Sequence, residues 1–232
     1  MEEKQNLWQM APPEAWRRAE VPLDADLPAL EEAASACRSC PLHANATQTV
    51  FGDGPADARI VFVGEQPGDR EDLEGLPFVG PAGKLLDRAL EEAGIERKSV
   101  YVTNVVKHFK WEPRGKKRIH AKPGSRDVKA CRPWLEAELH AVAPEILVCL
   151  GATAAAAILG SEARVERDRG RFMASPHASA TLVTIHPSAL LRERDEEARK
   201  RAYARFVADL RVVAAYARKK PHGKSPSRRP AA

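Results

Sequence analysis

The sequence predicts an α/β fold: three α/β/α layers around a central, mainly parallel four-stranded sheet. Short apolar runs alternate with segments of helical periodicity, which is the pattern of parallel strands joined by crossover helices. The strand runs are apolar at nearly every position, as expected for a sheet covered on both faces. With 232 residues, 44% of them hydrophobic, the chain is long enough for one domain with a substantial core.

The expected strands and helices alternate along the chain. Each apolar run ends near a glycine or a polar residue, and each helical segment has its apolar residues on one side. Gly94 is expected to end the first helix, and Asp127 is a suitable N-cap for the second. We expect strands at 59–64, 100–106, 145–150 and 180–185, helices at 82–93, 127–142, 153–159 and 195–217, and a hairpin arm at 164–173.

One domain is expected at residues 35–217. The lead-in, residues 1–34, contains four prolines and scattered acids and is expected to pack loosely, and residues 218–232 form a basic tail that we expect to be disordered. No apolar run approaches the roughly 20 residues of a membrane span, and the acidic N-terminus does not resemble a secretory signal. We therefore expect a monomeric cytoplasmic protein (nucleoid-associated if the source is prokaryotic) that binds no membrane.

The charge is concentrated in two segments. The net charge of +5 combines +7 over residues 107–129 and +6 over residues 218–229, so the remainder of the chain is acidic. Around Phe109 and Trp111 the first segment alternates basic and aromatic residues, a composition suited to phosphate contacts and base stacking. This asymmetry predicts a polyanionic partner.

Four cysteines indicate a metal site or reduced thiols rather than disulfides, because the sequence has no export signal. Cys37 and Cys40 form a CxxC pair, Cys131 is expected at the start of a helix, and Cys149 lies within a strand. Zinc ribbons usually pair two CxxC knuckles, whereas thiolate ligands alone also suit an iron–sulfur cluster. The spacing leaves three alternatives open: a cluster, zinc, or no metal with Cys149 as a small buried residue.

Polar residues gather at the ends of the expected strands, where the loops of a parallel sheet build the site. Residues 64–69 (GEQPGD) follow the first expected strand, and residues 150–153 (LGAT) follow the third. Asn104 ends the second strand, and its side-chain amide can read the edge of a base. His186 follows the last strand, and Phe78 lies in a Gly- and Pro-rich loop where it stacks on a planar ligand or fills the core. GEQPG is not GxGxxG, so a dinucleotide ligand is not favoured.

In this order the motifs resemble those of the uracil-DNA glycosylase superfamily. GEQPG resembles its first motif and His186-Pro187-Ser188 its second, while the four cysteines are similar to those of the iron–sulfur, family-four branch. That branch usually has Ala or Gly at the position of Gln66. Gln66 together with KKRIH (116–120) is similar to the family X (UdgX-type) glycosylases, whose insert usually reads KRRIH, so Lys117 departs from the pattern but keeps its charge. The resemblance covers about residues 35–217.

The resemblance implies a uracil-DNA glycosylase-like fold and an enzyme that excises uracil from DNA, with single strands favoured and free uracil as product. It also implies that a loop histidine attacks the sugar C1′ and keeps the enzyme covalently attached, and that a [4Fe-4S] cluster (alternatively zinc) is a structural cofactor. The implied residues fall into four groups. The catalytic residues are His120, Glu65, Gln66, Asp69 and His186; the uracil-binding residues are Gly64, Gln66, Phe78, Asn104 and His186; the DNA-binding residues are Lys107, Lys116, Lys117, Arg118 and Ser188; and the metal ligands are Cys37, Cys40, Cys131 and Cys149.

Two alternatives remain beside this interpretation. A conventional iron–sulfur glycosylase would turn over with a water activated by Glu65 or Asp69. It would release many uracil molecules per protein molecule, whereas a trapped enzyme would release one. A non-enzymatic DNA-binding protein would use the metal site only to hold its fold, and would bind uracil-free DNA equally well. An electron carrier is not favoured, because no motif for a partner cofactor is present.

Overall fold

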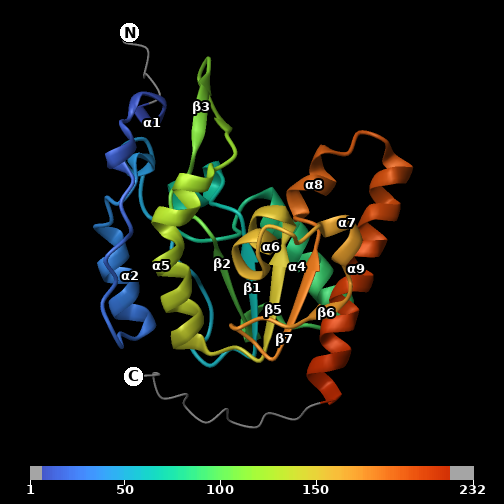
Figure 1. Ribbon diagram of the computed structural model, residues 1–232. Coiled ribbons are helices and arrows are strands. Elements are labelled where there is room, and N and C mark those ends of the chain that lie inside the picture. Colours follow the sequence, from blue (N-terminus) through green and yellow to red (C-terminus); the bar gives the residue numbers. More distant parts are fainter. Residues whose placement is uncertain (1–6, 220–232) are drawn as a thin grey trace.

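A computed structural model describes residues 7–219, and its centre is a five-stranded sheet with the strand order β2-β1-β5-β7-β6 (Figure 1). Four strands are parallel and lie where the apolar runs predict them, buried at every position. The fifth, β6, pairs antiparallel with β7 at the edge, so the expected four-stranded sheet gains one short strand. The strands of this sheet are β1 (Ile60–Gly64), β2 (Val100–Asn104), β5 (Ile146–Leu150), β6 (Phe172–Met173) and β7 (Ala180–Thr184).

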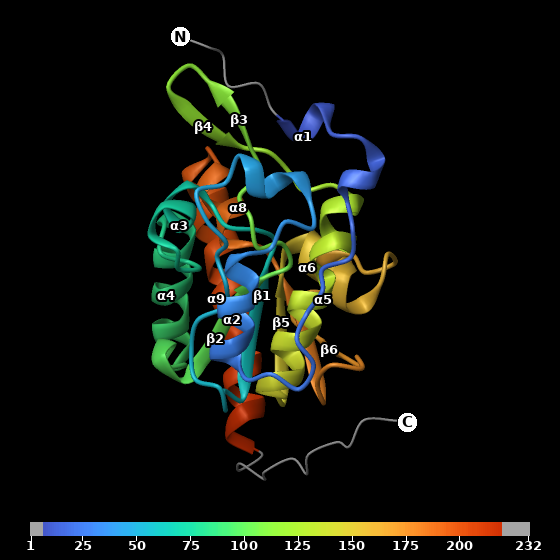
Figure 2. The same ribbon diagram turned by 90° about the vertical axis from the view of Figure 1, so that its left-hand side faces the viewer.

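Helices cover both faces of the sheet, which gives the predicted three-layer α/β/α arrangement (Figures 1 and 2). α5 and α6 lie on one face with α2 packed against α5, and α4, α8 and α9 lie on the other. Neighbouring residues of one strand, Val61 and Phe62, belong to different buried clusters, as expected for side chains that alternate across a sheet. No helix among residues 7–219 is both long and apolar enough to cross a membrane. The helices are α1 (Leu7–Met10), α2 (Leu27–Ser35), α3 (Asp69–Glu74), α4 (Pro81–Ala93), α5 (Ser125–Val142), α6 (Gly151–Leu159), α7 (Val165–Asp168), α8 (Pro187–Arg192) and α9 (Glu196–Lys219).

The lead-in is packed rather than loose, which corrects the expectation from its prolines and acids. Leu30 and Ala34 of α2 are buried in the cluster that α5 shares. The Ala19 N–H donates to the carbonyl of Ala130 in α5 at 3.0 Å. A few apolar residues between the prolines are therefore enough to anchor residues 7–34. The expected disordered tail lies outside the described residues from residue 220 onward.

Residues 164–173 form a short helix and a strand rather than one hairpin arm. α7 begins where Asp168 accepts the Arg164 N–H at 2.8 Å, and β6 follows after Gly170. Gly170 has a φ of +71°, a left-handed conformation that glycine adopts readily. The turn at this glycine lets the chain enter the sheet antiparallel to β7.

The expected basic loop is an antiparallel hairpin that projects beyond the carboxyl ends of the parallel strands (Figures 1 and 2). It consists of β3 (Trp111–Arg114) and β4 (Lys117–His120), joined at Gly115, whose φ is +59°. Trp111 and His120 form the pair at its base. The candidate nucleophile thus lies where the hairpin returns to the sheet, not at its tip.

Candidate active site

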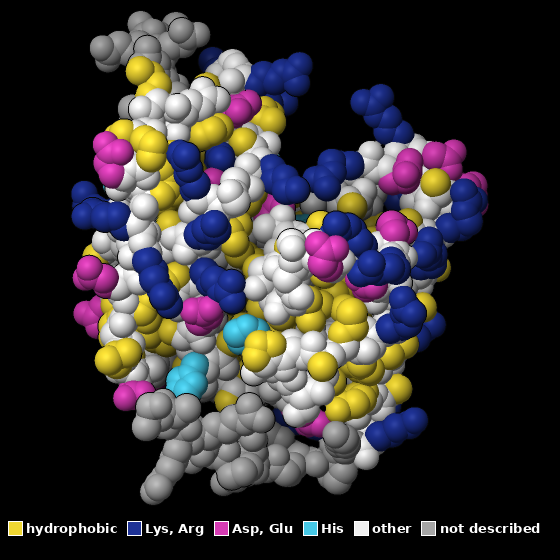
Figure 3. Space-filling model, in the orientation of Figure 1, with side chains coloured by type: hydrophobic (Ala, Val, Ile, Leu, Met, Phe, Trp, Pro, Cys, Tyr) yellow, Lys and Arg dark blue, Asp and Glu magenta, His cyan; other side chains and the backbone are white. Residues whose placement is uncertain are grey.

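A cavity of about 390 Å³ lies beyond the carboxyl ends of β1, β2 and β7. In Figure 3 the molecule is hollowed between the hairpin and α8, and Lys and Arg side chains surround the opening. The cavity therefore gathers residues that are far apart in the sequence. Seven of the predicted site residues line it: Gln66, Asp69, Phe78, Asn104, His120, His186 and Ser188.

Gly64, at the end of β1, lets three of these side chains converge. A Cβ at this position would lie 2.4 Å from Asn104 Oδ1, 2.8 Å from the Phe78 ring and 3.4 Å from His186 Nε2. Any larger residue would displace them. The amide of Asn104, the ring of Phe78 and the imidazole of His186 thus surround one point, as a small planar ligand with polar edges requires.

Phe78 is held in a strained backbone conformation. Its φ is +59°, a left-handed value that costs a non-glycine residue roughly 1–3 kcal/mol. The strain is maintained by close packing, since a Cβ at Gly83 would lie 1.6 Å from the Phe78 carbonyl oxygen. The ring centroid lies 6.1 Å from that of His186, with 31° between the ring planes. The sequence left stacking and core filling open, and the side chain both lines the cavity and belongs to the core.

The start of α8 sets the protonation of His186. The Ser188 N–H donates to His186 Nδ1 at 3.2 Å, and the Ser188 hydroxyl lies 2.8 Å from the same nitrogen. Burial lowers the pKa of His186 to about 4, and the positive charge of Arg192, with that of His120 when its ring is protonated, acts in the same direction. The ring is therefore neutral at pH 7 with its proton on Nε2, which makes Nε2–H a hydrogen-bond donor toward the cavity.

His120 and Glu65 face each other across the same site. His120 Nε2 lies 3.6 Å from Glu65 Oε1, and the other Glu65 oxygen, Oε2, accepts a short hydrogen bond from the Thr153 hydroxyl in α6. Burial lowers the pKa of His120, while Glu65 partly opposes the shift. Thr153 was not among the predicted residues, although it belongs to the LGAT loop that the sequence placed at this edge. The Thr153 hydroxyl binds one carboxylate oxygen of Glu65, and the other oxygen faces the His120 imidazole.

Gln66 joins the end of β1 to the base of the hairpin. Its Nε2 donates to the carbonyls of Lys110 (3.1 Å) and Ala121 (3.0 Å), and its Oε1 accepts the Lys110 N–H at 3.2 Å. Both N–H groups are thus used within the protein, so the side chain positions the hairpin and has no donor left for a ligand. An Ala or Gly at this position could not make these bonds.

A family model and three relatives bear on the family of this chain. Residues 51–211 match the model of the uracil DNA glycosylase superfamily. The chain belongs to the uracil-DNA glycosylase superfamily. It is 40% identical over 172 residues to the type-4 uracil-DNA glycosylase of Thermotoga maritima. The matched region covers 74% of this chain and 86% of the relative. It is 35% identical over 175 residues to that of Pyrobaculum aerophilum (72% and 86%) and 34% identical over 170 residues to that of Sulfurisphaera tokodaii (70% and 74%).

In this member of the superfamily, Arg118 fixes the hairpin to α3. Its guanidinium donates to Asp69 Oδ1 at 2.6 Å and to Asp72 Oδ2 at 2.5 Å, and it lies 5.4 Å from the centre of the Phe109 ring. Arg118 was predicted to contact DNA. Because two carboxylates bind it, it holds the hairpin against α3 instead, and Asp69 is engaged in the same ion pair.

The root of the hairpin, residues 107–111, is buried, which corrects three predictions for this glycosylase-superfamily chain. Lys107 is 1% exposed and its Nζ contacts Glu138, Thr103 and the Asn104 carbonyl, so it is not available to DNA. Phe109 is 1% exposed and Trp111 6%, so neither ring is free to stack on a base. The alternation of basic and aromatic residues here serves the core, because each lysine has a buried carboxylate partner. The partner of Lys110 is Asp127, at 2.9 Å.

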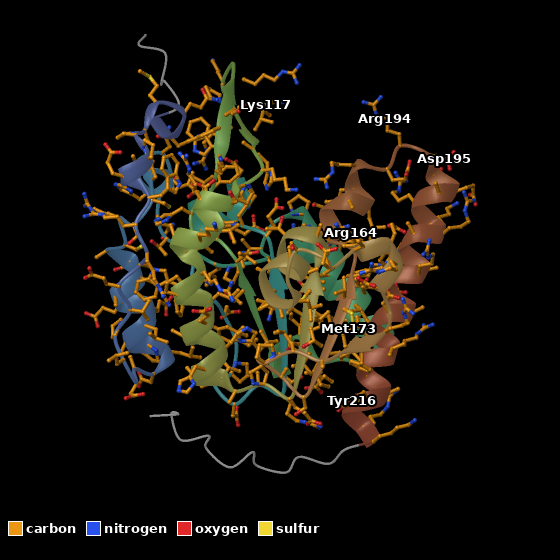
Figure 4. All side chains as sticks on the ribbon, in the orientation of Figure 1. Lys117, Arg164, Met173, Arg194, Asp195 and Tyr216 are labelled. Carbon is orange, nitrogen blue, oxygen red and sulfur yellow. The ribbon has the colours of Figure 1, made fainter. Side chains whose placement is uncertain are left out.

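The exposed cations of this superfamily member lie on both sides of the opening. Lys116 and Lys117 are exposed at the hairpin tip. Figure 4 places Lys117 on one side of the hollow and Arg194, between α8 and α9, on the other. These positions agree with the predicted phosphate contacts of Lys116 and Lys117, which stay predictions. Arg192 of α8 also lines the cavity and was not foreseen.

Three of the four cysteines lie together beside α5. The Trp134 Nε1–H donates to Cys37 Sγ at 3.3 Å, and the Lys107 N–H donates to Cys131 Sγ at 3.2 Å. Burial raises the pKa of Cys40 to about 12, with Cys37 adding to the effect, and burial likewise raises that of Cys131, to which Cys40 and Cys37 contribute. Cys40 and Cys131 are buried and Cys37 is half-buried, and neighbouring sulfurs that accept hydrogen bonds from N–H groups suit thiolate ligands of a metal cluster. The described residues contain no preformed group of three side chains arranged around one ion.

Cys149 differs from these three. It lies in β5, is 0% exposed, and burial alone raises its pKa to about 12. Its role as a fourth ligand stays a prediction, and its surroundings equally suit the small buried residue that the sequence left open.

Proposed function

We propose that this protein excises uracil from DNA, single strands included, and then remains covalently attached to the sugar C1′ through His120. The observation that carries the proposal is the position of His120, a neutral imidazole beside Glu65 in the same cavity as Phe78, Asn104 and His186. The type-4 uracil-DNA glycosylases among its relatives support the excision, and Gln66 with residues 116–120 supports the family X chemistry.

Uracil would enter the cavity as an extruded base, because a base in the stack is out of reach of such a pocket. Phe78 would stack on its face and the Asn104 amide would hydrogen-bond its edge. The His186 Nε2–H would donate to a uracil oxygen on which negative charge develops as the glycosidic bond breaks. Since His186 stays neutral down to about pH 4, it would be a donor without being an acid. Free uracil would be the leaving group.

The proposed attachment balances in electrons and protons. The electron pair of the N1–C1′ bond leaves with uracil, and a ring nitrogen of neutral His120 supplies a new pair to C1′. The imidazolium so formed loses its remaining N–H proton to solvent, and the departing uracil anion takes up one proton from solvent to become free uracil. Glu65, 3.6 Å from His120, would stabilise the positive charge on the sugar and then on the ring. No leaving group comparable to uracil is present in the product, so the bond persists.

A [4Fe-4S] cluster, alternatively zinc, is the proposed structural cofactor. Cys37, Cys40 and Cys131 would hold it, with Cys149 as the predicted fourth ligand. When bound, the cluster would join the segment that follows α2, through Cys37 and Cys40, to α5, through Cys131, so its binding energy would add to folding energy. Iron and zinc are distinguished by metal analysis and by visible absorption of the purified protein, which only the cluster gives.

The decisive test is the protein–DNA band that survives SDS and heat after incubation with a uracil-containing single strand. His120→Ala should abolish the band, and His120→Ser and His120→Gly should abolish it while permitting turnover. Wild-type protein should release one uracil per protein molecule. Release of many equivalents without the band would indicate conventional hydrolysis by a water at Glu65 or Asp69, and a full band from His120→Ala would contradict the assignment of the nucleophile.

The pH dependence of attachment supplies a second test. Because burial lowers the pKa of His120, its imidazole stays neutral to below the ordinary value of 6.5. We expect the attachment rate to be level from about pH 8 to pH 6.5 and to fall at lower pH, where the ring gains a proton. Glu65 raises this pKa, so Glu65→Gln should move the fall to still lower pH, whatever its effect on the maximal rate. A fall that begins above pH 6.5 would contradict the partly buried His120 imidazole as nucleophile.

A further inference from the structure

A second cavity, of about 590 Å³, lies between the lead-in and α5, away from the proposed uracil site. We call it the α5 groove. Figure 3 shows Lys and Arg side chains over α5 on the face toward the viewer, below the hairpin. Five cations line the groove: Arg17, Arg18, Arg126, Lys129 and Arg132.

The α5 groove has far more positive than negative charge. Glu136 is the one carboxylate among its lining residues, and it is already bound by Arg132 at 2.7 Å and by Arg18 at 3.7 Å. Arg17, Arg126 and Lys129 form no ion pair within residues 7–219. Exposed like charges that outnumber the carboxylates around them favour a polyanion as ligand.

The walls of the groove are fixed before any ligand binds. Trp16 lies in it and donates from Nε1 to Asp127 Oδ1 at 2.7 Å, while the Arg126 guanidinium lies 5.6 Å from the centre of the Trp16 ring. The Arg17 N–H donates to the Ser39 carbonyl at 2.8 Å, which holds the opposite wall. On α5, Arg126, Lys129 and Arg132 recur every third residue and span about 9 Å along the helix. A row of this length can contact successive phosphates of an extended strand.

The groove is also connected to the uracil site through the root of the hairpin. Asp127, which holds Trp16, accepts the Lys110 ammonium at 2.9 Å. The Lys110 carbonyl in turn accepts the Gln66 amide at the end of β1. These bonds hold the groove and the uracil cavity at a fixed position relative to each other. A single strand that binds at both sites requires such a fixed spacing.

We propose that the α5 groove binds the phosphodiester backbone of the substrate strand, to one side of the extruded nucleotide. The proposal rests on the DNA substrate of the proposed function but not on covalent trapping. The contacts are to phosphates, so they extend the footprint on the strand without reading its sequence.

The test compares Arg126→Gln/Lys129→Gln with wild type on single strands of two lengths. A uracil-free 25-mer measures binding without chemistry, by fluorescence anisotropy over a range of salt concentrations. Loss of two phosphate contacts should reduce the slope of log K against log salt by about 1.4 and weaken binding about tenfold. Uracil release from a 5-mer, which has few phosphates beyond the cavity, should stay close to the wild-type rate.

A matched control removes two cations elsewhere. Lys98→Gln/Arg205→Gln lies outside the groove and lowers the net charge equally, so it should keep the wild-type slope. Wild-type binding of the 25-mer by the groove variant would assign the groove to another polyanion and overturn the proposal. An equal loss in the control would also overturn it, because net charge would then explain the effect. If neither wild type nor the variants released uracil from the 5-mer, the proposed function would be wrong. The binding measurements on the 25-mer would still test whether the groove binds phosphates.

Discussion

The two halves of the basic hairpin segment have similar compositions and opposite environments. At the root, residues 107–111, Lys107 and Lys110 are buried against Glu138 and Asp127. At the tip, Lys116 and Lys117 are exposed and have no carboxylate partner within the described part of the chain. Positive charge therefore has two uses within about ten residues. A lysine that has a buried carboxylate partner holds the fold, and a lysine that has none is free to contact a ligand.

The largest expected effect is on the stability of the root. Lys107→Met would leave the Glu138 carboxylate buried without its cation, which costs about 3–5 kcal/mol in the free energy of unfolding. Lys107→Met/Glu138→Gln should recover most of that loss, because the glutamine oxygen can still accept from the Tyr101 hydroxyl. Chemical denaturation of both variants measures the difference.

The matched substitution at the tip is Lys117→Met, which should change the free energy of unfolding by less than about 0.5 kcal/mol. Equal stability of Lys107→Met and Lys117→Met would mean that the two halves of the segment do not differ as their burial indicates.

The fold was predictable from the sequence because its strands are apolar throughout. Runs such as residues 145–150 are short, apolar throughout and bounded by polar or glycine residues, which favours strands of a covered sheet, and all four expected strands were confirmed. β6 was expected only as part of a longer hairpin arm at 164–173, because two residues are too short for a periodic signal. The lead-in was misjudged because Leu30 and Ala34 are separated by acids, and their partner surface on α5 lies about 100 residues away in the chain.

The site was predictable in part, for a different reason. Strand ends are local signals, so Asn104 and His186 could be placed at one edge and do line one cavity. Lys107 could not be distinguished from Lys117, because the partner of Lys107 is Glu138, 31 residues later on a helix. Thr153 was likewise hidden, since a threonine near a helix start is usually only a local capping residue.

The next effect concerns how the root holds His120. Gln66→Ala and Gln66→Glu both remove the two N–H donors that bind the Lys110 and Ala121 carbonyls. A displacement of about 1 Å at a reacting group can cost roughly a hundredfold in rate, so covalent attachment should slow by tenfold or more. Uracil release should fall much less, because Asn104 and His186 are held by other elements. An equal loss of both rates would show instead that Gln66 acts on uracil.

A smaller effect is expected where Thr153 positions Glu65. Thr153→Val keeps the shape of the side chain and removes the hydroxyl, so Glu65 loses one of the two partners that fix it. A hydrogen bond to a charged group is worth about 1.5–3 kcal/mol. Loss of the lower value from the transition state should slow the attachment about tenfold. Thr153→Ser keeps the hydroxyl and should restore the rate. If serine were as slow as valine, packing of the methyl group, not the hydrogen bond, would matter.

The smallest effect should come from the tip, and it should appear in binding alone. Lys117→Gln removes one exposed cation beside the opening, so the affinity for a single strand should fall about threefold and the salt slope by about 0.7. The attachment rate at saturating DNA should not change, because His120 and Glu65 are held by the root and by Thr153 rather than by the tip. Rates measured at saturation and affinities measured across salt separate the two effects. A lower rate at saturation would mean that Lys117 acts on the reacting nucleotide, and the division of the segment into a structural root and a DNA-binding tip would then be wrong.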